Sequence, residues 1–156
     1  MKINWKILAV CVVIPLIVGG VSAVISMGGM EAFETLNQPP LSPPGWLFPV
    51  VWTILYVLMG IASYLICQAR ASKPAKESAL KVYALQLFFN FFWSIIFFNL
   101  KLFWFAFVWL LVLWVLILQC IRQFYPISKT AAYLMIPYLV WVTFAGYLNA
   151  GIAVLN

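Results

Sequence analysis

Histidine is absent from the 156-residue sequence, and carboxylate side chains are scarce, with three Asp and Glu residues in total. Without histidine the chain cannot form a bis-histidine haem site, a histidine-based zinc site or a histidine general base. Three carboxylates leave little material for a proton relay of acidic side chains or for the acid pair of a glycosidase. We therefore expect no metal site and no required cofactor.

Charged residues are also rare, at 8% of the sequence, whereas hydrophobic residues make up 67% and aromatic residues 18%. A soluble domain averages about 25% charged residues. A soluble fold of this size leaves roughly a third of its unfolded surface exposed, so it could not hide so many apolar residues. The net charge of +6 is scattered along the chain and forms no patch for nucleic acid. The composition predicts an integral membrane protein that does not bind nucleic acid.

Stretches without charge mark where the chain can cross a bilayer, because a helix needs about 20 apolar residues to do so. The segment NQPPLSPPG at 37–45 is too rich in proline to be helical. Residues 82–121 contain a single charge, Lys101, and as one helix they would be about 60 Å long, twice the thickness of the bilayer core. This stretch is therefore two helices joined near Lys101. We predict an all-α bundle of five transmembrane helices in one domain over 1–156, with spans at about 5–26, 46–69, 80–99, 102–121 and 130–154 and a proline-rich outer loop at 27–45.

Five spans place the two ends of the chain on opposite sides of the membrane. Eight of the nine Lys and Arg residues fall on the side of the N-terminus, and Lys101 alone falls on the other side. Cytoplasmic loops carry an excess of Lys and Arg. We therefore predict a cytoplasmic N-terminus and a C-terminus outside, in the inner membrane of a bacterial cell.

The first span has one rival interpretation. Lys2 and Lys6, the apolar run after them and the small residues VSA at 21–23 resemble a signal peptide with its cleavage site. Cleavage would leave four spans. The apolar run continues past Ala23 and is long enough to cross a bilayer, which favours a retained helix.

Polar and aromatic side chains recur along one face of three predicted spans. A lone Asn or Gln within a span usually bonds a neighbouring helix, and a buried indole N–H needs a partner. Residues three or four apart lie on the same side of a helix. The resulting stripes are Phe48, Trp52 and Tyr56 on the second span, Gln86, Asn90, Trp93 or Ser94, and Phe97 on the third, and Pro137, Trp141, Ala145 and Asn149 on the fifth.

These stripes could meet in the outer half of the bundle. A rise of 1.5 Å per residue places Trp52 and Trp93 about 9 Å, and Trp141 about 18 Å, from the outer ends of their helices. A cavity with such a lining would suit a flat, apolar, aromatic ligand. Aromatic core packing without a ligand explains the same spacing, and periodicity does not decide between the two.

Three longer patterns make the sequence recognisable. PP-x-x-x-F-P-x-V-W-T-x-L-Y begins at Pro43, N-x-x-W-S begins at Asn90, and P-Y-x-x-W-x-x-F-A-x-x-L-N begins at Pro137. In this order, and over nearly the whole chain, they resemble the translocator protein family, also called tryptophan-rich sensory proteins or peripheral-type benzodiazepine receptors.

The resemblance implies a five-helix bundle, usually a homodimer, with a ligand pocket open toward the first interhelical loop. Family ligands include protoporphyrin IX, sterols in animal members and synthetic benzodiazepine-site drugs. The implied function is a membrane receptor or carrier for porphyrins and related flat ligands. Two further roles stay open, which are light-dependent porphyrin degradation, as in some bacterial members, and a sensory scaffold that controls a partner.

The resemblance also assigns residues. The two family tryptophans tied to the porphyrin chemistry match Trp52 and Trp141, which are the candidate catalytic pair. Asn90, Trp93, Tyr56 and Asn149 match pocket residues of the family. With the rest of the stripes and the entrance to the second span, the predicted ligand-binding set is Phe48, Trp52, Tyr56, Gln86, Asn90, Trp93, Phe97, Trp141, Ala145, Asn149, Pro43, Pro44 and Trp46.

The chain departs from the family pattern in its outer loop and in its fifth span. Family members commonly carry Trp just before the second proline pair of the loop, where this chain has Leu41, and many carry Tyr at the position of Phe33. The sterol motif of animal members needs a basic residue in the fifth span, and none follows Lys129. We therefore do not expect specific sterol binding, although Lys81, Tyr83 and Leu85 match a reversed form of that motif.

Overall fold

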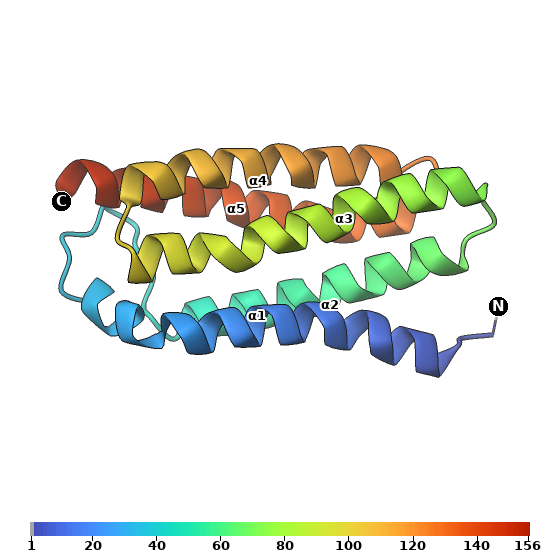
Figure 1. The fold of residues 1–156 in the computed structure, drawn as a ribbon, viewed down its shortest axis with the longest axis horizontal. Coiled ribbons are helices and arrows are strands. Elements are labelled where there is room, and N and C mark those ends of the chain that lie inside the picture. The colour runs from blue at the N-terminus through green and yellow to red at the C-terminus, as the bar shows by residue number, and fades with distance from the viewer. Residues whose placement is uncertain (1) are drawn as a thin grey trace.

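A computed structural model describes residues 2–156 and shows an all-helical chain (Figure 1). Five helices are long and apolar enough to cross a membrane, which confirms the predicted five-helix membrane fold. The elements are α1 (Trp5–Phe33), α2 (Leu47–Gln68), α3 (Lys73–Ser94), a π-helical turn η1 (Ile95–Asn99), α4 (Phe103–Phe124) and α5 (Lys129–Leu155).

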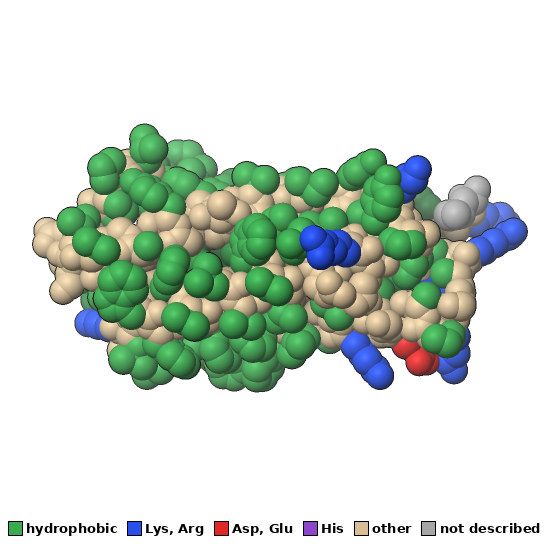
Figure 2. All heavy atoms as spheres, turned by 90° about the horizontal axis from the view of Figure 1, so that it is seen from above, with side chains coloured by type: hydrophobic (Ala, Val, Ile, Leu, Met, Phe, Trp, Pro, Cys, Tyr) green, Lys and Arg blue, Asp and Glu red, His purple; other side chains and the backbone are tan. Residues whose placement is uncertain are grey.

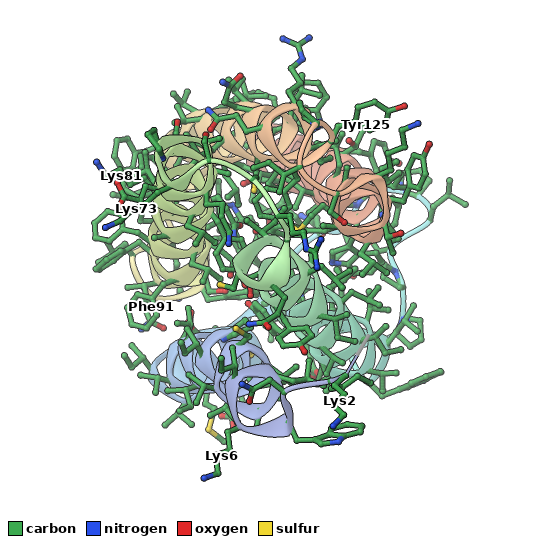
Figure 3. The ribbon with its side chains drawn as sticks, turned by 90° about the vertical axis from the view of Figure 1, so that its right-hand side faces the viewer. Lys2, Lys6, Lys73, Lys81, Phe91 and Tyr125 are labelled. Atoms are coloured by element: carbon green, nitrogen blue, oxygen red, sulfur yellow. The ribbon has the colours of Figure 1, made fainter. Side chains whose placement is uncertain are left out.

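The helices run lengthwise beside one another and close into a ring (Figures 1 and 3). Going round the ring, α1 packs on α2, α2 on α5, α5 on α4 and α4 on α3, and α3 with η1 returns to α1. Helix α5, the last along the chain, therefore lies between α2 and α4 and separates two helices that come before it.

Local sequence explains where three helices begin. The side chains of Asn4, Ser72 and Ser128 accept hydrogen bonds from the backbone N–H groups of Ile7, Ala75 and Ala131, at 3.2, 3.3 and 3.2 Å. Such N-caps satisfy amides that have no partner within the helix.

Helix α1 is longer than the predicted first span, which was placed at about 5–26. It continues to Phe33, so the predicted loop at 27–45 is wrong at its beginning, and the connection to α2 comprises 34–46. Packing explains the extension. The ring of Phe33 lies 5.5 Å from the ring of Phe98 on η1, and a side chain at Gly29 would collide with the carbonyl group of Phe98.

Helix α3 likewise begins at Lys73, before the predicted span that started near residue 80. The first turns of α3 carry charged residues. These charges keep the turns out of the apolar core of a membrane but do not prevent them from forming a helix. The capping side chain of Ser72 and the proline in the first turn favour a helix start here.

Apolar side chains cover the outside of the bundle along most of its length, whereas most Lys and Arg side chains gather toward one end (Figure 2). We call this the basic end. It contains the N-termini of α1, α3 and α5, and Lys2, Lys6, Lys73 and Lys81 lie at its rim (Figure 3). The opposite end, called the loop end, carries residues 34–46 and Lys101.

Close contact between α1 and α2 depends on glycine. A Cβ atom at Gly60 would lie 2.5 Å from the Cα atom of Val12 on α1. A side chain at Gly19 on α1 would overlap the ring of Tyr56 on α2. These two glycines let the helices approach, as small residues do at helix interfaces in membranes.

Candidate ligand-binding site

Four buried side chains form a continuous hydrogen-bonded chain through the middle of the bundle. The hydroxyl of Tyr56 donates to Oδ1 of Asn90 at 2.7 Å, and Nδ2 of Asn90 donates to the hydroxyl of Tyr138 at 2.8 Å. The Tyr138 hydroxyl in turn donates to Oε1 of Gln86 at 2.6 Å. We call these residues the polar chain. It joins α2, α3 and α5. Of the predicted site residues, Tyr56 bonds Asn90 directly, and Tyr138 links Asn90 to Gln86.

Trp52 packs against both tyrosines of the polar chain. Its ring is stacked on Tyr56, with centroids 5.6 Å apart and an angle of 27° between the planes. The edge of Tyr138 meets it at 6.2 Å and 72°. Both geometries are favourable for aromatic pairs. Trp52 therefore lies where α2 and α5 meet, with a defined orientation.

Trp141 lies in the same seam between α2 and α5, one turn along α5 from Tyr138. Its ring meets the ring of Phe48 on α2 at 6.0 Å, and Phe48 is one turn from Trp52. The indole N–H of Trp141 is buried and has no hydrogen-bond partner. A buried donor without a partner costs free energy unless something accepts its hydrogen bond. We call Phe48, Trp52, Tyr138 and Trp141 the aromatic seam.

Trp93 and Asn149 form a second polar contact nearer the loop end. The indole N–H of Trp93 donates to Oδ1 of Asn149 at 3.1 Å, and Nδ2 of Asn149 donates to the carbonyl oxygen of Phe103 at 2.8 Å. Phe97 stacks on Trp93 at 5.2 Å, and Ala145 is buried one turn before Asn149 on α5. These residues tie α3, α4 and α5 together.

The connecting loop 34–46 is fastened to the end of α5. The backbone N–H of Asn37 donates to Oδ1 of Asn156 at 3.2 Å, and Nδ2 of Asn156 donates to the carbonyl oxygen of Asn37 at 2.8 Å. The hydroxyl of Tyr147 donates to the carbonyl oxygen of Pro40 at 2.6 Å. Leu41 is 83% exposed and has a positive φ of 70°, so the residue that replaces a family tryptophan points away from the bundle.

The three predicted site residues from this region lie apart from the aromatic seam. Pro43 is half-buried, Pro44 is exposed, and Trp46 is 67% exposed at the entrance to α2. Among the described residues, no ring contact joins Trp46 to Trp52 or Trp141.

Two hollows of the molecule lie away from the aromatic seam. A cavity of about 10 Å³ lies at the loop end, and an open hollow of about 490 Å³ lies at the basic end. Neither is lined by Trp52 or Trp141. Phe48, Trp52 and Trp141 are each half-buried, so part of each side chain remains accessible from outside the bundle.

The chemistry that the seam can offer is limited to stacking and hydrogen bonding. Among residues 2–156, no group of three or more His, Cys, Asp or Glu side chains lies close enough to hold a metal ion. The seam and the polar chain contain aromatic rings, amides and hydroxyls, and no charged side chain. This arrangement suits a flat, apolar molecule rather than an ion.

Sequence reasoning missed Tyr138, although the neighbouring residue Pro137 was included in the stripe of the fifth span. In the structure Pro137 is exposed and Tyr138 is completely buried. A helical series from Tyr138 through Val142, Ala145 and Asn149 matches the buried face of α5. This spacing is present in the sequence, but the series that begins at Pro137 reaches Asn149 equally well, so the spacing does not single out Tyr138.

The reversed sterol pattern is not available to lipid in this structure. The ring of Tyr83 is buried against Phe124 of α4, at 6.1 Å between centroids. Its hydroxyl is also buried. A sterol lying on the outside of the bundle would not reach this hydroxyl.

Comparisons with known proteins agree with the three sequence patterns. The sequence model of the TspO/MBR family matches residues 11–155. The chain is 36% identical over 124 residues to the tryptophan-rich protein TspO of Chlorobaculum tepidum, covering 80% of this chain and 78% of that protein. It is 36% identical over 119 residues to the tryptophan-rich sensory protein of Cereibacter sphaeroides, covering 76% and 73%. It is 34% identical over 123 residues to the translocator protein of Bos taurus, covering 78% and 72%.

Proposed function

The chain belongs to the TspO/MBR family, and we propose that it is a membrane receptor or carrier that binds porphyrins of the protoporphyrin IX type, and related flat apolar ligands, at the aromatic seam. The observation that carries this proposal is that Trp52 and Trp141 lie in one uncharged seam between α2 and α5, where Trp52 contacts Tyr138 and Trp141 contacts Phe48. Stacking faces come from both indoles. The unpartnered N–H of Trp141 supplies a donor for an acceptor atom on the ligand.

Binding between Phe48 and Trp141 would widen the seam, because their rings now lie 6.0 Å apart. Phe48 is half-buried and lies in the first turn of α2, directly after the loop 34–46. Movement of this turn would separate Phe48 from Trp141 and leave the core below in place. The predicted loop residues Pro43, Pro44 and Trp46 would then lie at the mouth of the opened site.

The proposal is tested by titrating the purified protein with protoporphyrin IX and following both tryptophan fluorescence and the porphyrin Soret band. We expect Trp52→Phe and Trp141→Phe each to weaken binding about tenfold, because each removes one large stacking face. Trp104→Phe is the matched control, since Trp104 is 57% exposed on the outside of α4. Affinity that is the same in all three variants and the parent would reject this site.

We propose light-dependent oxidation of the bound porphyrin as a second activity of the same site. The seam has no acid–base pair, so the porphyrin would act as its own photosensitiser toward dioxygen, with Trp52 and Trp141 as redox partners. Porphyrin absorbance should then fall under light in the parent, and not in the dark or in Trp52→Phe or Trp141→Phe. Equal bleaching with and without protein contradicts this activity.

The alternative role is a sensory scaffold whose ligand state controls a partner. It is supported by the name of the Cereibacter sphaeroides relative, a tryptophan-rich sensory protein. Variants at Trp52 and Trp141 separate the roles. A scaffold that works without the ligand retains its partner in co-purification after porphyrin affinity is lost.

We further propose a bacterial inner membrane, with the basic end at the cytoplasm, and a homodimer. The excess of Lys and Arg at the basic end supports the orientation. The dimer is proposed from family resemblance alone. Gly19 and Ala23 on α1 form a small-xxx-small pair of the kind that can join helices of two chains, but Gly19 packs against Tyr56 within one chain. Chemical cross-linking in native membranes tests the dimer.

A further inference from the structure

We infer that Tyr138 is a positioning residue, which with the rest of the polar chain holds Trp52 in the orientation that receives a flat ligand. This inference rests on the proposed function and deepens it. It assigns Tyr56, Asn90 and Gln86 a share in supporting Trp52 through Tyr138 and Tyr56.

The first argument is the use of donors and acceptors along the chain. Each tyrosine has one O–H donor, and both donate within the chain, Tyr56 to Asn90 and Tyr138 to Gln86. Asn90 uses its amide oxygen and its amide nitrogen in the same chain. The three hydrogen bonds therefore run in one direction. They lead from Tyr56 on α2 to Asn90 on α3, then to Tyr138 on α5 and back to Gln86 on α3.

The second argument is burial. Tyr138 and Gln86 are completely buried, and Tyr56 and Asn90 are 8% and 4% exposed. A hydrogen bond in such surroundings is strong, and an unpaired group there is costly. Each tyrosine has spent its one O–H within the chain, so a ligand that accepted this hydrogen would have to break a buried bond, whereas the amide of Asn90 keeps a second N–H. Among the described residues, the partner of Gln86 Nε2 is the sulfur of Met59, at 3.9 Å. Gln86 lies one turn from Asn90 toward the basic end, whereas Trp52 lies one turn from Tyr56 toward the loop end.

The third argument is the position of Trp52 between the two tyrosine rings. Tyr56 covers a face of the indole, and the edge of Tyr138 meets it from α5. The two hydrogen bonds at the Tyr138 hydroxyl prevent that ring from swinging away. Trp52 is thus held before any ligand arrives, which lowers the entropy lost on binding.

The consequence is a site that selects ligands by shape. A fixed indole wall accepts flat aromatic faces and disfavours bulky saturated ones. The Tyr138 hydroxyl contributes to affinity through Trp52, so the effect of its removal should vanish when Trp52 is absent.

A double-mutant cycle tests this dependence. We expect Tyr138→Phe to weaken protoporphyrin IX binding about tenfold in the parent and to have no further effect in Trp52→Phe. Tyr133→Phe is the matched control, because Tyr133 is 55% exposed on the same helix. If Tyr138→Phe weakens binding equally in both backgrounds, Tyr138 does not act through Trp52 and the inference is wrong.

A second measurement needs no ligand. With 5-fluorotryptophan incorporated, the fluorine resonance of Trp52 is assigned by its loss in Trp52→Phe. We expect Tyr138→Phe to shift or broaden this resonance and to leave that of Trp104 unchanged. An unchanged Trp52 resonance would overturn the inference, even if protoporphyrin does not bind and the proposed function fails.

Gln86→Met provides a second test in case the Tyr138→Phe variant does not fold. It removes the acceptor of the Tyr138 hydroxyl with a side chain of similar length. The same change in the Trp52 resonance is expected, because the far end of the chain is released. No change in this folded variant would contradict a role for the chain in holding Trp52.

Discussion

At the scale of single residues, polar contacts hold the bundle together at a few defined places. Asn149 is 1% exposed and bonds both the indole of Trp93 on α3 and the carbonyl oxygen of Phe103 on α4. One side chain therefore connects three helices. Its replacement by an apolar side chain leaves a buried N–H without a partner.

We predict that Asn149→Leu lowers the free energy of unfolding by about 1–2 kcal/mol, because buried unpaired groups and lost interhelical bonds cost this much. Reversible unfolding in mixed micelles with increasing SDS measures the change. Thr53→Val is the control, since the exposed Thr53 hydroxyl bonds only Pro49 of its own helix. Equal losses in both variants would show that the buried hydrogen bonds of Asn149 stabilise the protein no more than the exposed hydroxyl of Thr53 does.

Residue types at the site were easier to predict from the sequence than the exact face of each helix. Trp52 and Trp141 stand in patterns that mark them directly. On α5, however, Pro137 and Tyr138 are adjacent and differ by about 100° around the helix. A stripe that begins at either residue reaches Asn149, so spacing alone left the choice open until the packing of α5 against α2 was known.

At the scale of whole helices, glycine contacts decide how closely α1 approaches α2. Gly60 lies against the backbone of Val12, whereas a side chain at Gly20 would meet nothing within 4 Å. Gly60 is buried in the interface and Gly20 is exposed, so the two glycines provide a test position and its control.

Gly60→Ala should destabilise the protein by about 1–3 kcal/mol, because overpacking forces the two helices apart. Gly20→Ala should be neutral or stabilising by up to about 1 kcal/mol, since alanine is the better helix former. Both are read from the same SDS unfolding curve. A Gly60→Ala variant as stable as Gly20→Ala would mean that the helices tolerate a wider separation.

Hydropathy predicts which residues cross a membrane better than it predicts where each helix begins and ends. The sequence predicted the number and order of the five helices, because each contains a long stretch without charge. It did not predict that α1 continues to Phe33, because that extension depends on packing against Phe97 and Phe98. These contacts join residues far apart in the sequence, so local patterns do not contain them.

At the scale of the whole molecule, charge distribution predicts the orientation in the membrane. We expect a membrane-impermeant maleimide to label Leu41→Cys in intact cells, because Leu41 is 83% exposed at the loop end. Lys73→Cys, whose parent side chain is 87% exposed at the basic end, should react only after the cells are permeabilised. The three native cysteines are first replaced by alanine. Labelling of Lys73→Cys in intact cells, with none at Leu41→Cys, would reverse the orientation.

The order of helices around the ring also has a consequence for how the protein is made. A ribosome releases α1 to α4 before α5, yet α5 lies between α2 and α4 and supplies Tyr138. Until it inserts, the amides of Asn90 and Gln86 lack their shared partner inside the bilayer. The nascent protein therefore passes through a four-helix stage with an open, incompletely bonded side, and entry of α5 closes this side and completes the core in one step.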